Sequence, residues 1–97
     1  MSTYNLTLDK DNTINISGYI TFENIIDILN DSKKIIKNLI EIKIDFKNVL
    51  SINSCILIYI LDCMKNAKKQ NKKIIFKNIP PYLIELSKVY NLETTIK

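Results

Sequence analysis

Apolar and polar residues alternate in the first part of the chain, which is the pattern of half-buried strands. Positions 4–8 alternate in this way, and so do positions 14–16 on the other side of the polar run 9–12. This run is rich in turn-forming residues, so the pattern predicts an antiparallel hairpin. Gly18, the only glycine of the chain, is expected to end the second strand.

Further along, apolar residues spaced by three and four alternate with short apolar runs, which indicates helices alternating with strands. We expect strands at 42–46 and 73–78 and a helix over 22–39 that Thr21 caps. A long apolar helix begins at Ser54, and a last helix begins at Pro80-Pro81, since proline suits the first helical turn.

The element order ββαβαβα implies βαβ units and therefore a mostly parallel sheet, which the opening hairpin makes mixed. We expect a single α/β domain over 1–97 with a four- to five-stranded sheet and helices mainly on one face; the fifth strand would be 93–96. One core is expected to contain Ile44, Phe46, Leu57, Leu61 and Ile75.

The chain length and composition fit a globular protein. Apolar residues make up 46% of 97 positions, and the longest apolar run, 55–61, is far short of the roughly 20 residues that span a bilayer. The polar N-terminus carries no signal-peptide pattern, so we expect a soluble cytoplasmic protein without direct membrane insertion. Cys55 and Cys63 lie too far apart on one predicted helix, roughly 12 Å, for a disulfide.

A net charge of +4 raises the question of nucleic-acid binding. All fourteen basic residues are lysines, so the chain has none of the arginines that make most specific base contacts. It also has no cluster of aromatic residues on which bases could stack. We therefore expect no nucleic-acid partner. The cluster of Lys65, Lys68, Lys69, Lys72 and Lys73 is interpreted as a solvated helix end whose cations favour the C-terminal dipole; weak attraction to anionic surfaces is the alternative.

The residue types that most enzymes use are missing from this sequence. It has no histidine, no CxxC pair, no glycine-rich phosphate loop and no nucleophile elbow. Asp45 and Asp62 have no obvious carboxylate partner, and no activating base lies near Ser54 in the sequence. We expect a protein that is not an enzyme, with no catalytic residue, no metal site and no cofactor.

The run from Ile42 to Leu92 resembles the STAS domain, which is found in anti-sigma-factor antagonists and in transport subunits. In that family a strand leads to an Asp-Ser or Asp-Thr pair that opens a helix, and a later strand and an N-x-P turn lead to a last helix. The corresponding segments here are Asn53-Ser54, 74–76, Asn78-Ile79-Pro80 and 86–92. Together with residues 67–73, this ending is most similar to the small cytoplasmic STAS subunit of the Mla phospholipid-transport ABC complex.

The resemblance implies that Ser54 is the functional position. It is the position at which the antagonists are phosphorylated and at which Mla-type subunits carry a threonine that contacts the transporter. Here Asn53 replaces the family's aspartate, and Cys55-Ile56 replace the small residues that often follow the hydroxyl. These departures favour a packed partner surface over a phosphosite, while a plain N-cap serine is the structural alternative, with a contribution of about 1 kcal/mol.

The helix after Ser54 is apolar around most of its circumference, which is typical of a helix that is buried or binds a partner. We expect Leu57 and Leu61 to cover the sheet and Ile56 and Tyr59 to form a partner surface together with Asn53 and Ser54. The alternative is that the helix over 22–39 covers Ile56 and Tyr59.

Two functions follow from the resemblance. The first is an accessory subunit that binds the cytoplasmic ATPase of a Mla-type ABC transporter and, through it, the permease. It would support transporter assembly or activity in maintaining outer-membrane lipid asymmetry, held at the inner membrane through its partner. The alternative is an anti-sigma-factor antagonist switched by phosphorylation of Ser54, where a phosphate would add nearly two negative charges.

Overall fold

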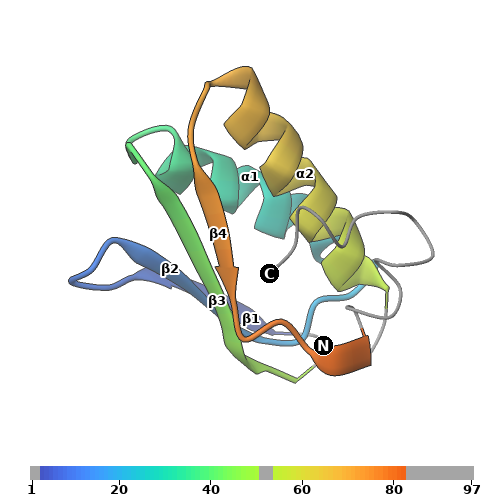
Figure 1. Ribbon diagram of the computed structural model, residues 1–97. Helices are drawn as coiled ribbons and strands as arrows, with labels where there is room; N and C mark the ends of the chain where they lie inside the picture. Colours follow the sequence, from blue (N-terminus) through green and yellow to red (C-terminus); the bar gives the residue numbers. More distant parts are fainter. Residues whose placement is uncertain (1–2, 51–53, 83–97) are drawn as a thin grey trace.

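A computed structural model of the chain describes residues 3–50 and 54–82 (Figure 1). Two strands, a helix, a strand, a helix and a strand follow one another in this part of the chain. Their bounds are Tyr4–Leu8 (β1), Thr13–Gly18 (β2), Ile25–Ile36 (α1), Ile42–Val49 (β3), Cys55–Lys69 (α2) and Ile74–Lys77 (β4). The rest of the expected third helix, beyond Tyr82, and the expected strand at 93–96 lie outside the described residues.

The four strands form one mixed sheet in the order β1-β2-β3-β4. The hairpin strands β1 and β2 are antiparallel, whereas β3 runs parallel to both β2 and β4. Each parallel connection passes through a helix, and α1 and α2 lie together on one face of the sheet (Figure 1). This arrangement follows from the right-handedness of βαβ crossovers, and it confirms the predicted α/β domain with a mixed sheet.

The core lies between the sheet and the two helices. Ile44 stands at its centre, because it pairs with Ile14 on one side and with Phe76 on the other, and all three side chains are buried. The neighbouring residues on β3, Ile42 and Phe46, are also buried. Apolar residues at every second position of β3 therefore provide a continuous row on the helix-covered face.

Two of the five residues predicted for the core lie elsewhere. Ile44, Phe46 and Leu57 are buried as expected. Ile75 is only partly buried, because it pairs with Lys43 and side chains alternate along a strand, so it faces the side of the sheet opposite to the core residues. Leu61 is 41% exposed, since the buried stripe of α2 runs through other positions.

Gly18 ends β2, as the sequence predicts, and its backbone explains why glycine stands there. Its φ is +86°, and a Cβ built on it would lie 2.5 Å from the carbonyl oxygen of Thr3. A side chain here would be strained by the left-handed backbone and would clash with the backbone of the residue that precedes β1. The chain can turn here only because the residue is small.

The entry into α1 is fixed by reciprocal hydrogen bonds between Thr21 and Asn24. The Thr21 hydroxyl accepts from the Asn24 N–H at 3.3 Å, and the Thr21 N–H donates to Asn24 Oδ1 at 2.8 Å. Asn24 also donates through Nδ2 to the carbonyl of Tyr19. These bonds resemble a capping box with asparagine as the second partner, but they close the turn that precedes α1. The helix itself begins at Ile25 with Asn24 as its N-cap residue, so it is shorter than the expected range 22–39 and Thr21 does not occupy its N-cap position.

Candidate functional site

Ser54 occupies the N-cap position of α2, but its hydroxyl does not cap the helix. Its backbone is helical, with φ −75° and ψ −2°, and its carbonyl accepts the Leu57 N–H at 3.0 Å. The side chain makes no capping hydrogen bond and is exposed. The hydroxyl is therefore presented to solvent at the positive end of α2, whose first turn holds no acidic residue.

Ile56 and Tyr59, predicted to face a partner, are instead buried in the core. Both side chains have 0% of their surface exposed. The Tyr59 ring packs edge-on against Phe46, with ring centres 6.1 Å apart, and its hydroxyl lies 2.8 Å from the Ser32 hydroxyl of α1. The prediction that Ile56 and Tyr59 point outward is therefore wrong, because α1 covers that side of α2.

The exposed side of α2 next to Ser54 is formed by Ile58 and Leu61. These residues follow Ser54 by four and seven positions, a spacing that keeps all three on one face of a helix. Ile58 is 42% exposed and Leu61 is 41% exposed. With Leu57 they line a hollow of about 230 Å³ on the helix surface. We call Ser54, Ile58 and Leu61 the Ser54 surface.

More exposed apolar residues lie at the same end of the sheet as Ser54. The strands β2 and β3 are parallel, so the connections to α1 and α2 leave from one edge, as Figure 1 shows. The Leu50 N–H donates to the Gly18 carbonyl at 2.8 Å, which joins the two connections. Three large side chains of these connections are exposed: Phe22 at 75%, Leu50 at 61% and Tyr19 at 49%.

Asn53, the other residue predicted for a partner contact, lies outside the described residues. The roles predicted for Asn53 and Ser54 in binding stay predictions. Ile58 and Leu61 were not assigned to the site from the sequence, although their spacing from Ser54 was a usable signal. That signal was masked because apolar residues occupy almost every position from Cys55 to Leu61.

The turn after β4 holds the Asn78-Ile79-Pro80 segment close to the sheet. Asn78 has a positive φ of 56° and donates through Nδ2 to Asp45 Oδ1 on β3 at 2.9 Å. The same carboxylate oxygen accepts the Lys47 N–H at 2.8 Å. Asp45 therefore organises the backbone around it, and these bonds give the residue a structural role.

The buried titratable groups of α2 are held protonated by their surroundings. Burial raises the pKa of the Cys63 thiol to about 12 and the pKa of the Tyr59 hydroxyl well above its usual value. Across 3–50 and 54–82, no three His, Cys, Asp or Glu side chains gather in a way that could hold a metal ion. No helix within these ranges is both long and apolar enough to cross a membrane.

The chain is similar to known proteins both in sequence and in fold. A family model of the STAS domain matches residues 6–97, and the chain belongs to the STAS domain family. Among solved structures, it is similar to the anti-sigma factor antagonist SpoIIAA in its unphosphorylated form, with a TM-score of 0.72 and 15% sequence identity. That match covers 98% of this chain and 86% of the other. No curated protein matches the chain.

Proposed function

We propose that this STAS domain is a non-enzymatic binding module that docks onto a partner protein through the Ser54 surface. The observation that carries this proposal is the position of Ser54, an exposed residue whose hydroxyl makes no capping hydrogen bond, on the same helix face as Ile58 and Leu61. The hydroxyl offers one oriented polar contact, and the two side chains offer apolar area. A small apolar patch with a polar group beside it is a common form of a protein interface.

The apolar contacts available on this surface would contribute part of the binding free energy. Covering the exposed parts of Ile58 and Leu61 would contribute about 1 kcal/mol each. Phe22 and Tyr19, from the connection that leaves the same edge of the sheet, add aromatic area, and aromatic residues are frequent hot spots. The interface would then extend from α2 over the ends of β2 and β3.

The partner that we propose is the cytoplasmic ATPase of a Mla-type phospholipid-transport ABC transporter. Membership in the STAS family and the resemblance of residues 67–73 and 86–92 to the small STAS subunit of that complex support this choice. In this role the protein is cytoplasmic, reaches the permease and the inner membrane through the ATPase, and supports the transporter in maintaining outer-membrane lipid asymmetry.

A second candidate function is that of an anti-sigma-factor antagonist switched by phosphorylation of Ser54. The exposure of the Ser54 side chain favours it, because the buried Ile56 does not crowd the hydroxyl. A phosphate at this helix start would also be stabilised by the dipole of α2. The similarity to the fold of SpoIIAA is compatible with this function as well.

Co-purification tests the main proposal. The chain is co-expressed with the ATPase subunit of a Mla-type transporter from the same organism, and the complex is recovered through a tag on the ATPase. We expect Ile58→Asp and Leu61→Asp to remove most of the bound chain and Ser54→Ala to reduce it modestly. Ile40→Asp is the matched control, because Ile40 is 93% exposed and follows α1 at the opposite end from Ser54. Equal recovery of all four variants would refute the proposed surface.

Intact-mass measurement of the protein from its native cell separates the two functions. We expect no stoichiometric phosphate on Ser54 if the chain is a transporter subunit. A full phosphate on Ser54 that disappears in Ser54→Ala would favour the antagonist function instead.

A further inference from the structure

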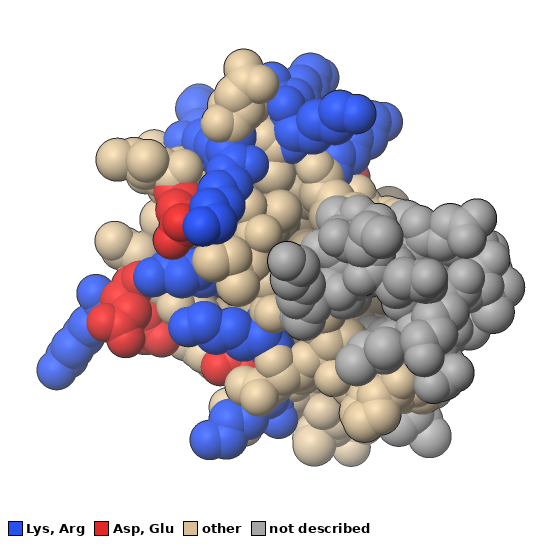
Figure 2. Space-filling model, viewed as in Figure 1, with Lys and Arg blue, Asp and Glu red and all other residues tan. Residues whose placement is uncertain are grey.

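Lysine side chains gather at the end of the molecule opposite to Ser54. Figure 2 shows them at the top of the view, where α2 ends and β4 begins. The segments 33–41 and 65–73 contain eight lysines and a single carboxylate, Glu41, a formal excess of seven positive charges. We call this the basic end; its lysines are Lys33, Lys34, Lys37, Lys65, Lys68, Lys69, Lys72 and Lys73.

Both helices end in this region, which explains part of the charge. Lys72 donates through Nζ to the carbonyls of Ile36 at 2.9 Å and Lys37 at 3.3 Å, and so caps α1. The negative ends of two helix dipoles amount to about one charge in total. Glu41 lies 4.0 Å from Lys73, which neutralises at most one more lysine. Dipoles and pairing therefore leave most of the positive charge without compensation.

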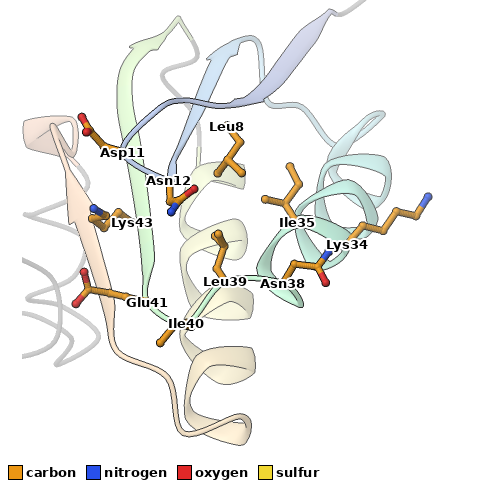
Figure 3. A pocket seen from close by; sticks show the side chains of 10 residues that line it. All are labelled: Leu8, Asp11, Asn12, Lys34, Ile35, Asn38, Leu39, Ile40, Glu41 and Lys43. Carbon is orange, nitrogen blue, oxygen red and sulfur yellow. The ribbon is translucent and has the colours of Figure 1, made fainter.

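An apolar element accompanies the charge. Ile40 is 93% exposed on the connection from α1 to β3, between the basic residues of 33–37 and Lys43. Beside it lies a hollow of about 600 Å³, into which Leu8, Ile35 and Leu39 project, whereas Lys34 extends away from it (Figure 3). Asp11 and Glu41 also line this hollow, so its rim carries both signs of charge.

We propose that the basic end adsorbs to an anionic lipid bilayer, with lysines at the headgroups and Ile40 at the interface. Lysines spread over a surface with an exposed apolar residue among them are suited to a diffuse, anionic, partly apolar surface. A nucleic acid fits less well, because the segments 33–41 and 65–73 contain no arginine and no aromatic residue for base contacts or stacking.

The proposal is independent of the partner that Ser54 contacts. Ser54 lies roughly 22 Å from the C-terminal end of α2, whereas Leu61 lines one hollow together with Lys65 and Lys68. A bilayer at the basic end would therefore leave Ser54 and Ile58 free for a protein and would lie close to Leu61.

Sedimentation with vesicles tests the proposal on the full chain. Vesicles of phosphatidylcholine alone are compared with vesicles of equal parts phosphatidylcholine and phosphatidylglycerol, at about 0.05 M and about 0.5 M salt. We expect binding only to the anionic vesicles and a strong loss at high salt. A lysine near an anionic bilayer increases the binding constant about fivefold. The double variant Lys68→Gln with Lys69→Gln should therefore lower the binding constant for anionic vesicles about 25-fold.

The matched control is the double variant Lys47→Gln with Lys77→Gln, which removes the same charge from exposed positions outside the basic end. We expect it to lower vesicle binding less than about threefold. Equal losses in the two double variants, or equal binding to neutral vesicles, would overturn the proposal. So would tighter binding of a single-stranded oligonucleotide than of anionic vesicles under the same salt conditions.

Discussion

The hydroxyls of Ser32 and Tyr59 lie 2.8 Å apart inside the joint between α1 and α2. Both residues are almost fully buried, and the Cys63 sulfur lies 3.9 Å from the Ser32 oxygen. A buried polar pair of this kind fixes how the two helices meet, because each hydroxyl would be costly to bury without the other. The pair also explains why the aromatic ring of α2 points inward and is not available to a partner.

A double-mutant cycle measures this pair. Tyr59→Phe leaves the buried Ser32 hydroxyl without its short contact and should lower the free energy of unfolding by about 1–2 kcal/mol. Adding Ser32→Ala should cost clearly less than the sum of the two single changes, since no polar group is then left unsatisfied. Urea unfolding followed by circular dichroism gives the four values. Simple additivity would show that the hydroxyls do not interact.

Stability is expected to fall in alkaline solution. Burial raises the folded-state pKa of Cys63 from 9.0 to about 12, and that of Tyr59 well above 10.0. Above about pH 9 the unfolded chain loses protons that the folded chain keeps, so the free energy of unfolding decreases as the pH rises toward the folded-state values.

Urea midpoints measured between about pH 8 and 11 test this dependence. The Cys63→Ala variant is the control, and its midpoint should fall less steeply between about pH 9 and 10, below the ordinary pKa of tyrosine. A wild-type midpoint that stays constant over this range would contradict the buried, protonated state of both groups.

Gly18 should not tolerate a side chain. Gly18→Ala places a Cβ at a φ of +86° and 2.5 Å from the Thr3 carbonyl oxygen, so we expect a loss of about 2 kcal/mol or more. Chemical denaturation provides the measurement. Thr3→Ala is the companion change, because it alters the side chain and keeps the carbonyl; it should have little effect. A Gly18→Ala variant as stable as the wild type would mean that β1 and β2 meet differently.

Ile56 and Ile58 of α2 should respond very differently to substitution by aspartate. Ile56→Asp buries a carboxylate in the core and should lower the free energy of unfolding by several kcal/mol or prevent folding. Ile58→Asp adds a charge to an exposed position and should leave stability within about 0.5 kcal/mol. Thermal unfolding compares the two variants. A larger loss of stability in Ile58→Asp than in Ile56→Asp would contradict the burial of Ile56.

The sequence was sufficient for the sheet and for the end of β2. Alternation along 42–46 predicted the row that includes Ile44 and Phe46, and Gly18 was placed correctly because its role is local, whereas α1 begins after Asn24 and not directly after Thr21. The orientation of α2 could not be derived in the same way. Its first seven residues, 55–61, are all apolar, so no polar stripe marks the exposed side, and tertiary contacts decide which residues face inward.

The error at the candidate site follows from that ambiguity. Leu57 and Leu61 were expected to cover the sheet, which turned Ile56 and Tyr59 outward; in the structure Ile56, Tyr59 and Ile60 are fully buried. The helix is rotated about its axis relative to the expectation, and the Tyr59 hydroxyl lies beside Ser32 of α1, a contact between distant parts of the chain that the sequence pattern does not mark. Ser54 itself was recognised because a hydroxyl at a strand-to-helix junction is a local signal.

Site-specific photocrosslinking in the native cell tests the central claim most directly. A photoreactive residue replaces Ile58 in one strain and Ile40 in a second, because both side chains are exposed and the two positions lie near opposite ends of the helices. We expect the ABC ATPase subunit to crosslink from position 58 and not from position 40. An ATPase crosslink from position 40 alone, or a crosslink from position 58 to a kinase or an anti-sigma factor, would contradict the account.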